Sequence, residues 1–308
     1  MRVLVTGGNG FVGGYAIDAL RARGDEVIAA GHGALDLLPL DVRDPLNVRG
    51  VIDIAQADAI VHLAAQAFVP QSIADPLATI DINAMGTARL LEAVRSARDA
   101  GGNNPRVLIV STAEVYGAQP PSAFPLREST PPAPANPYAA SKLAAEAFGI
   151  ASGHAYGLDV IIARSFNHIG PGQDERFAVA SFAAQLAKIA HGGPAEMLIG
   201  NLSAERDFLD VRDVVRAYVA LLECGETGQI YNVCSGVAVP IRDVLRTLVT
   251  TARVAVEIRE DPERMRASDT PLFVGDASKL RAATGWVPQI TLETSLRDTY
   301  RAAYERAA

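Results

Sequence analysis

The stretch VLVTGGNGFVGG, residues 3–14, decides the fold class of this chain. A short apolar run ends in a glycine-rich turn, and an apolar helical pattern follows it. Gly7, Gly10 and Gly13 stand three residues apart, which allows a tight turn and a close backbone approach to a ligand. Amides at a helix start attract a pyrophosphate, although a structural turn also accounts for such glycines. We predict a dinucleotide-binding turn formed by Gly7, Gly10, Phe11, Val12 and Gly13.

The first half of the chain alternates between two kinds of apolar pattern. Short β-branched runs, typical of strands buried on both faces of a parallel sheet, occur at residues 26–30, 59–65, 106–112 and 159–165. Helical patterns lie between them at residues 13–23, 81–98 and 138–156. This alternation predicts an α/β fold of the Rossmann type, with a doubly wound parallel sheet.

The alternation loosens after residue 167, where we expect a smaller α/β lobe. A helical pattern at 211–223 followed by an apolar run at 229–235 indicates that the chain returns to the sheet before finishing in the lobe. We therefore expect a dinucleotide-binding domain over residues 1–166 plus about 211–235. The lobe, which would bind the substrate, takes residues 167–210 and 236–308 and is discontinuous.

Composition narrows the function classes. The 308 residues carry a net charge of −7 with no evident basic patch, which argues against nucleic-acid or anionic-membrane partners. Apolar runs are too short to span a bilayer. Cys224 and Cys234 form no CxxC pair and lie away from histidine clusters, so we expect no metal site and a reduced setting. The sequence begins with a strand rather than a leader, and we expect a cytoplasmic protein.

The end of the second predicted strand bears on the choice of cofactor. An acidic residue that holds the adenosine ribose is usual there in NAD-binding units, but this chain has Gly31 followed by His32. With no carboxylate to oppose a 2′-phosphate and no arginine beside it to demand one, both NADPH and NADH remain candidates. Asp41 and Val42 end the next short strand, where Asp41 either meets the adenine edge or is a solvated turn residue.

The stretch PYAASKLAAEAFG, residues 137–149, places a phenol and an amine one helical turn apart. Asn136 is predicted to cap this helix, and Pro137 suits its first position. Tyr138 and Lys142 then share a face near the positive helix end, which predicts a tyrosine pKa below its usual value of about 10. Such a tyrosine can act as an acid or base. A lone pair with this spacing also arises by chance, as an aromatic packed beside a surface lysine.

Several motifs occur together in a characteristic order: TGGNGFVGG (6–14), HLAAQ (62–66), DINAMGTARLLEA (81–93), STAEVYG (111–117) and NPYAASK (136–142). In this order they resemble the extended short-chain dehydrogenase/reductase family of nucleotide-sugar enzymes, over essentially the whole chain. The resemblance implies that Tyr138 is the proton donor or acceptor, that Lys142 also holds the nicotinamide ribose, and that Thr112 hydrogen-bonds the reacting sugar oxygen. It places further cofactor-binding positions at Leu63, Ala64, Ala65 and Asn83, the last also a structural and proton-relay position.

The second half resembles one branch of this family more closely. RSFNHIGPGQ (164–173), GNLSAERDFLDVRD (200–213), YNVCSG (231–236) and DPERMRASDTP (261–271) are similar to GDP-4-keto-6-deoxy-D-mannose reductases, and less so to GDP-mannose 4,6-dehydratases. The resemblance implies a GDP-linked deoxyhexose as substrate, diphosphate contacts from Asn167, Arg206 and Arg266, and a guanosine-ribose contact from Asp269. Ala267 departs from the proline common in relatives, and Arg206 has an alternative as an ion-pair partner of Asp207 or Asp210.

Glu114 leaves the reaction open between reduction and dehydration. It occupies the place of the glutamate that removes the C5 proton in 4,6-dehydratases of this family, although some of the reductases also keep it. Ala113 disfavours the glucose-type dehydratases, which have Asp there. The NHIGPGQ loop and the short chain favour NAD(P)H-dependent reduction to GDP-D-rhamnose. GDP-mannose 4,6-dehydration, or another nucleotide-sugar epimerase or dehydratase activity, remains the alternative, and a non-catalytic NAD-binding protein is a minor one.

The helical stretches 81–98 and 138–156 carry extra apolar surface. Relatives pair these helices across a four-helix interface, so the resemblance implies a homodimer, although burial against the chain's own lobe explains the pattern equally well. The sequence leaves the product's configuration at C4 open between rhamnose and 6-deoxy-talose.

Overall fold

The carboxyl ends of seven parallel strands form the edge on which the site is built. The computed structural model describes residues 1–33, 36–262 and 270–307. The strands are adjacent in the order β10-β6-β5-β4-β1-β2-β3. Their bounds are β1 Arg2–Thr6, β2 Glu26–Gly31, β3 Leu38–Pro39, β4 Ala59–His62, β5 Arg106–Thr112, β6 Val160–Ser165 and β10 Ile230–Val233. Every pairing between them is parallel, which confirms the predicted Rossmann-type fold.

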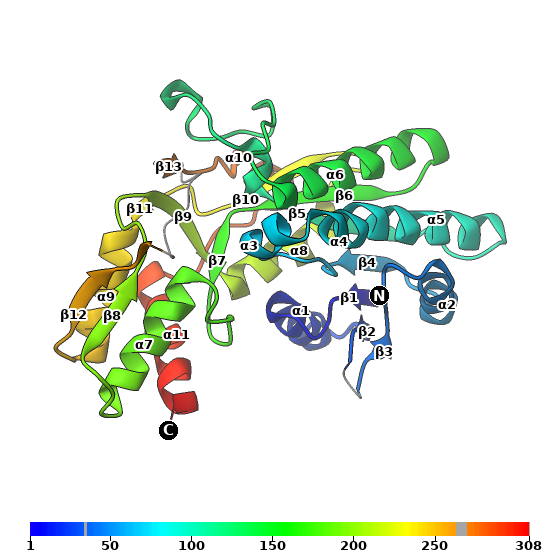
Figure 1. Cartoon of the computed structure of the whole chain (residues 1–308). Helices are drawn as coiled ribbons and strands as arrows, with labels where there is room; N and C mark the ends of the chain where they lie inside the picture. Colours follow the sequence, from blue (N-terminus) through cyan, green and yellow to red (C-terminus); the bar gives the residue numbers. More distant parts are fainter. Residues whose placement is uncertain (34–35, 263–269, 308) are drawn as a thin grey trace.

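Helices cover both faces of this sheet (Figure 1). One face packs against α1 (Phe11–Ala22) and α8 (Val211–Cys224). The other lies under α2 (Pro45–Ala55), α5 (Gly86–Asp99) and α6 (Pro137–Tyr156). The helix predicted over residues 81–98 is not regular at its start: short α3 (Val69–Ala74) and α4 (Pro76–Ile80) lead into a π-helical turn, Asp81–Met85, before α5 begins.

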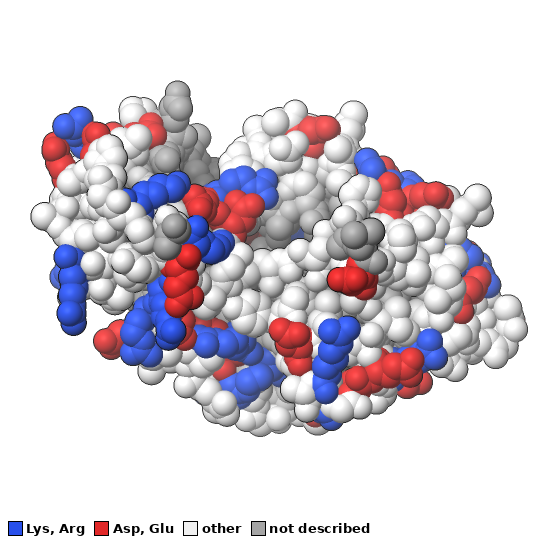
Figure 2. Space-filling model, turned by 90° about the horizontal axis from the view of Figure 1, so that it is seen from below, with Lys and Arg blue, Asp and Glu red and all other residues white. Residues whose placement is uncertain are grey.

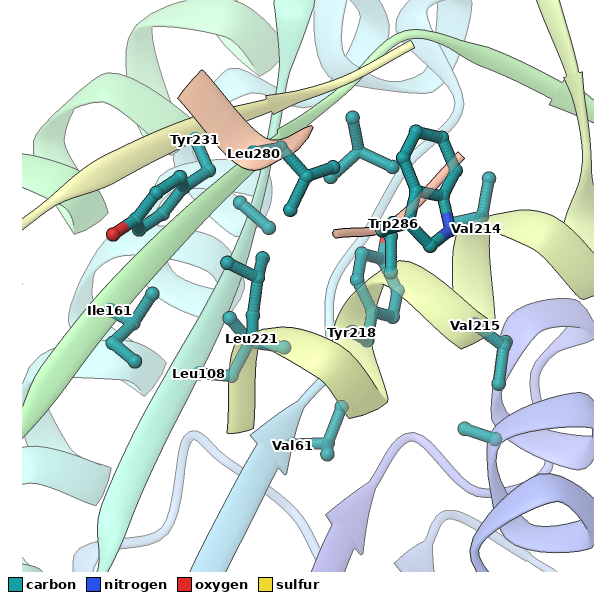
Figure 3. Packing of buried hydrophobic residues seen from close by; sticks show 14 of the residues in the cluster. Val61, Leu108, Ile161, Val214, Val215, Tyr218, Leu221, Tyr231, Leu280 and Trp286 are labelled. Atoms are coloured by element: carbon teal, nitrogen blue, oxygen red, sulfur yellow. The ribbon is translucent and has the colours of Figure 1, made fainter. Parts of the chain in front are cut away.

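The two cores follow from the period of two along each strand. Leu108 and Ile161 point to the α8 face and pack with Tyr218 and Leu221 (Figure 3). Ile109 and Ile162, one residue further along, point to the opposite face. All four side chains are fully buried, as expected for strands covered on both sides.

The remaining elements form a smaller lobe. β7 (Asn167–Ile169), β9 (Glu205–Asp210), β11 (Ala238–Pro240) and β13 (Leu272–Phe273) make a four-stranded sheet, and β8 (Glu196–Ile199) pairs with β12 (Glu257–Glu260). Around them pack α7 (Ala178–Ala190), α9 (Ile241–Ala252) and α11 (Leu292–Ala307), whereas α10 (Ser278–Thr284) lies beside β10 (Figure 1). The domain boundaries near residues 166, 211 and 235 stay a prediction.

The surface carries both charges. Acidic and basic side chains are interspersed over the face in Figure 2. Ion pairs between exposed side chains include Arg176 with Asp174 at 2.9 Å. Within the described residues, the helices are too short or too polar to cross a membrane.

Candidate active site

The glycine-rich turn packs directly against the end of β4. Gly7 has φ +71°, and a Cβ there would lie 2.8 Å from the amide nitrogen of Ala64. A Cβ on Gly13 would lie 2.2 Å from the carbonyl oxygen of Gly7, so a side chain would push α1 off the turn. Thr6 Oγ1 accepts hydrogen bonds from the Leu63 and Ala64 amides at 3.2 Å. These contacts bring the predicted cofactor stretches at residues 7–13 and 63–65 together.

The first turn of α1 supplies the donors that a dinucleotide diphosphate needs. The helix begins at Phe11 after Gly10, so the first amides have no intrahelical acceptor. A Cβ on Gly10 would lie 3.2 Å from the Gly7 carbonyl oxygen. Because Gly10 has no side chain, a ligand can approach the backbone of this turn closely. Small residues and aligned amides fit a pyrophosphate.

Asn9 lies beside the predicted adenosine-binding end of β2, and the sequence pattern did not indicate it. Its Nδ2 donates to the His32 carbonyl at 2.8 Å, and a Cβ on Gly31 would lie 2.6 Å from its Oδ1. Asn9 thus fills the space where a larger residue at position 31 would stand. The signal for it was the glycine at the end of β2, which leaves room for a side chain from the glycine turn.

The predicted adenine-side residues take two different environments. Asp41 binds Arg43 at 2.8 Å, which holds the pKa of the Asp41 carboxyl at about 2, and the nearby His32 acts in the same direction. Val42 is buried in the core, and a Cβ on Gly86 would lie 2.8 Å from its Cγ2. Asp41 is therefore an ion-paired residue beside the end of β2, and its contact with adenine stays a prediction.

Two predicted catalytic side chains, Thr112 and Tyr138, lie close together at the carboxyl end of β5, and the third, Lys142, follows on the same helix. Thr112 ends that strand, its Oγ1 accepts from the Glu114 amide at 3.2 Å, and its hydroxyl acts to lower the pKa of Tyr138 in the first turn of α6. Asn136 caps α6 as predicted, because its Oδ1 accepts from the Ala139 amide at 2.8 Å. Lys142 follows Tyr138 by one turn and is 5% exposed. The cap and the strand end together fix where the phenol lies.

The predicted lowering of the Tyr138 pKa is wrong. Burial raises the pKa of Tyr138 to about 12, against the smaller effect of the Thr112 hydrogen bond, and the charge of Glu114 raises it further. Burial also lowers the pKa of Lys142 to about 8, partly offset by Glu146. Loss of solvent around the phenolate therefore outweighs the helix dipole and the lysine that the sequence argument relied on. Tyr138 keeps its proton at neutral pH, as a proton donor must.

Asn83 links two parts of the site. It lies in the π-helical turn, where its Oδ1 accepts from the Gln66 amide at 2.8 Å. Its Nδ2 donates to the Gln66 carbonyl and to Ser141 Oγ, both at 2.9 Å, and Ser141 donates to the Tyr138 carbonyl. Asn83 therefore ties the loop after β4 to the helix of Tyr138, in keeping with its expected structural role. Its contact with the cofactor stays a prediction.

Glu114 lies close to the catalytic helix. It belongs to a short 3-10 turn, Ala113–Tyr116, and its Oε2 accepts from the cap residue Asn136 at 3.3 Å. Its charge acts on the phenol of Tyr138. This position suits either a base near the sugar or a residue that fixes the helix cap, so the geometry keeps both interpretations.

The predicted substrate residues are only partly described. Asn167 is exposed at the start of β7. Arg206 in β9 donates through Nη1 to the carbonyls of Glu205 at 2.9 Å and Thr270 at 2.7 Å. Its two suggested acidic partners bind elsewhere: Asp207 accepts from Ser235 and Gly236, and Asp210 binds Arg212. Arg266 and Asp269 lie outside the described residues.

A buried ion pair beneath the catalytic helix was also missed. Glu146 of α6 binds Arg164 of β6 at 2.6 Å, and Ser111 of β5 donates to the same carboxylate at 2.5 Å. The sequence contains two signals for it: an arginine inside an apolar strand, and a glutamate four residues after Lys142. Neither indicates the pairing without the alignment of β5, β6 and α6.

Comparisons with known proteins agree with this site. The family model described as GDP-mannose 4,6 dehydratase matches residues 4–299. GDP-6-deoxy-D-mannose reductase of Pseudomonas aeruginosa is 42% identical over 96% of this chain and 95% of its own. A solved structure of RMD from the same organism with NADPH has a TM-score of 0.88 at 38% identity, covering 99% of this chain and 100% of its own.

A second solved structure extends the range of cofactors. UDP-glucose 4-epimerase of Thermus thermophilus in complex with NAD has a TM-score of 0.88 at 32% identity, covering 98% of this chain and 99% of its own. Similar folds thus hold either nicotinamide cofactor. The chain belongs to the GDP-mannose 4,6-dehydratase family of NAD(P)-dependent, extended short-chain dehydrogenase/reductases that act on nucleotide sugars.

Proposed function

We propose that this enzyme reduces the C4 ketone of GDP-4-keto-6-deoxy-D-mannose with NADH or NADPH, giving GDP-D-rhamnose. The observation that carries the proposal is the Thr112–Tyr138 pair beside Lys142, with a phenol that holds its proton at neutral pH because burial raises its pKa to about 12. Reduction of a ketone needs such a proton donor. The similarity to the Pseudomonas reductase supports the same direction.

Each side chain has a separate part in this reaction. When bound, the nicotinamide supplies the hydride that C4 receives. Tyr138 gives its proton to the C4 oxygen, and Thr112, whose hydroxyl acts on the phenol, orients that oxygen and polarises the carbonyl. Lys142 holds the nicotinamide ribose through its charged amine and eases proton transfer to Tyr138. No net charge then remains on the product oxygen.

The cofactor would lie along the carboxyl edge of the large sheet. The first-turn amides of α1 would bind its diphosphate, and the stretch 63–65 would line its central part. His32 and Asp41 would lie near the adenosine. Arg43 is held by Asp41 at 2.8 Å rather than committed to a 2′-phosphate, so the proposal keeps both NADH and NADPH.

The GDP moiety would bind the smaller lobe through Asn167, Arg206, Arg266 and Asp269. Arg206 suits a diphosphate because its planar guanidinium matches two oxygens at once. We further propose a homodimer through the end of α4, the π-helical turn, α5 and α6, where Ile80, Met85 and Phe148 are exposed apolar side chains. A four-helix interface would cover them.

Dehydration of GDP-mannose is the second candidate, because Glu114 acts on Tyr138 and contacts Asn136 at 3.3 Å. In that reaction Glu114 would remove the C5 proton of the 4-keto intermediate, and the hydride taken from C4 would return to C6. The cofactor would not be consumed. The two candidate reactions thus differ in whether reduced cofactor is consumed.

The test is the loss of reduced-nicotinamide absorbance when the purified protein meets GDP-4-keto-6-deoxy-D-mannose, with NADH and NADPH in separate reactions. Loss equal to the amount of product supports reduction and ranks the cofactors. NMR of the C4 proton then separates the rhamnose product from 6-deoxy-talose. A folded protein that binds cofactor and consumes none contradicts the proposal. Formation of a keto sugar from GDP-mannose, abolished in Glu114→Gln, would then identify the dehydratase.

A further inference from the structure

Two ionisable side chains buried under the catalytic helix have no part in the proposed chemistry. Glu146 is 1% exposed and Arg164 is 3% exposed. The Glu146 carboxylate accepts from Arg164 Nη2 at 2.6 Å, from Arg164 Nε at 3.0 Å and from Ser111 Oγ at 2.5 Å. Burying charged groups this deeply costs free energy, because they lose their hydration, so the pair calls for a functional explanation.

The pair lies directly beside Lys142. Glu146 follows Lys142 by four residues, so both project from the same face of α6, and both are buried. Ser111 and Arg164 are aligned neighbours on β5 and β6, near the carboxyl ends of these strands. The carboxylate therefore joins the helix of the catalytic lysine to the sheet at the edge where the cofactor would bind.

Stability alone does not account for the pair. A well-packed apolar pair of similar volume often holds a helix to a sheet at least as well as a buried ion pair. Here the pair is also incomplete, since Arg164 Nη1 is buried without a hydrogen-bond partner in the described part of the chain. The guanidinium instead lies 4.7 Å over the Tyr116 ring, and Tyr116 donates to Asn232 at 2.7 Å.

We propose that Glu146 and Arg164 are positioning residues for Lys142, a buried ion pair whose carboxylate keeps the amine charged and directed at the ribose hydroxyls of the cofactor. The inference rests on the proposed role of Lys142. Arg164 holds the carboxylate in place and limits its effect, so the two charges act on the lysine in opposite directions. Neither residue touches the cofactor itself.

The other titratable groups around Lys142 are neutral or act on Tyr138, so the charges that act on the lysine amine are those of Glu146 and Arg164. From β4, His62 faces the lysine but is neutral, since burial lowers its pKa to about 3. Tyr138, on the same helix, is neutral at physiological pH, and the charge of Glu114 acts on Tyr138. Glu146 raises the pKa of Lys142, which burial brings to about 8. The pKa of Lys142 therefore lies close to physiological pH, where a small shift in pKa changes the charged fraction of the amine.

The test measures NADPH and NADH affinity between pH 6 and 10 by cofactor fluorescence, with no sugar present. Binding should weaken as Lys142 loses its proton. Glu146→Gln removes the negative charge and should move this alkaline midpoint down by about one pH unit or more. Arg164→Met removes the positive charge and should move it up. Ser111→Ala changes no charge and should leave the midpoint in place.

Opposite shifts support the proposal, because a merely structural role predicts no such difference in sign. Midpoints that stay unchanged, or move in the same direction, overturn it. If the single variants do not fold, Glu146→Gln/Arg164→Met removes both charges, and the proposal predicts a lower midpoint because Glu146 acts more directly on Lys142. An unchanged midpoint in that variant overturns the proposal. The readout needs no sugar, so failure of the proposed ketone reduction is detected separately.

Discussion

The two faces of the large sheet are equally buried but differently composed. Under α8, Leu108 and Ile161 pack with Tyr218 in an apolar core that includes the Tyr218–Ser165 hydroxyl pair at 2.6 Å. Under α6, the apolar core around Ile109 gives way at the strand ends to Ser111, Arg164 and Glu146. The buried pair of Glu146 and Arg164 therefore lies on the face that carries Lys142, whereas the buried carboxylate of the α8 face, Asp213, binds Arg216 on the same helix.

The α8 face mainly stabilises the fold, whereas the α6 face also carries the side chains of the candidate active site. Burial of apolar side chains against both faces supplies the main driving force for folding of the sheet. Clustered ionisable groups with shifted pKa values mark functional places in a structure. On this account, substitutions on the α8 face should change stability alone, whereas those on the α6 face should change the chemistry as well.

The largest contrast is expected between Tyr138 and the buried Tyr218. Tyr138→Phe removes the proton donor and should lower turnover by about 10²–10⁴-fold with cofactor affinity retained. Tyr218→Phe removes a hydroxyl bonded to Ser165 and should cost about 1 kcal/mol of stability with near-normal turnover. Steady-state kinetics and chemical unfolding measure both. Unchanged turnover in Tyr138→Phe would instead support a non-catalytic NAD-binding protein.

Two core substitutions of similar cost sharpen the contrast. Leu108→Ala, on the α8 face, should lower the free energy of unfolding by about 2–5 kcal/mol by leaving a cavity. Glu146→Gln should cost about 3–5 kcal/mol, because it leaves Arg164 buried and unpaired. Only Glu146→Gln should also change the pH dependence of cofactor binding. A similar pH change in Leu108→Ala would mean that loosening either face perturbs the site, and the contrast would fail.

Alkaline pH should act on activity and stability in opposite directions. Turnover per bound substrate should fall about tenfold per pH unit above about 8, as Lys142 loses its proton. The pKa of Lys142 in the folded protein lies below its usual value of 10.5, so the unfolded chain binds more protons between these values. The contribution of Lys142 to stability should therefore rise through this range. Kinetic and unfolding series from pH 7 to 10 test both signs, and Lys142→Met should lose both effects.

The smallest effect is expected at the cap of α6. Asn136→Ala removes the acceptor for the Ala139 amide and should destabilise the protein by about 1 kcal/mol. Because Asn136 also contacts Glu114, a several-fold loss of turnover should accompany it. Asp44→Ala removes the corresponding cap of α2 and is the matched control, with the same loss of stability and normal turnover. Equal turnover in the two variants would show that the contact between Asn136 and Glu114 does not affect catalysis.

Sequence reasoning could predict those parts of the molecule that local pattern determines. The glycine spacing requires the turn between β1 and α1, and the alternation of apolar runs gives the doubly wound sheet. Thr112 and Tyr138 lie close together and Lys142 follows one helical turn later, while their catalytic roles stay a prediction. These features depend on residues close in the chain or on the shared edge of a parallel sheet.

Features that depend on tertiary burial were missed or predicted wrongly. The sign of the Tyr138 pKa shift depends on desolvation by several elements, which helix position alone does not reveal. The Glu146–Arg164 pair depends on how α6 lies over β5 and β6. The contact of Asn9 with His32 depends on the turn after β1 lying against the end of β2. The start of the predicted helix at residue 81 is a π-helical turn that Asn83 holds to Gln66 and Ser141.

The most direct test of the central claim follows the hydride itself. The enzyme is supplied with GDP-4-keto-6-deoxy-D-mannose and reduced cofactor that carries deuterium at the transferable position of the nicotinamide ring. The account predicts one deuterium at C4 of the product sugar for each cofactor oxidised. A product that carries deuterium at C6, or cofactor that stays reduced while the sugar changes, would contradict it.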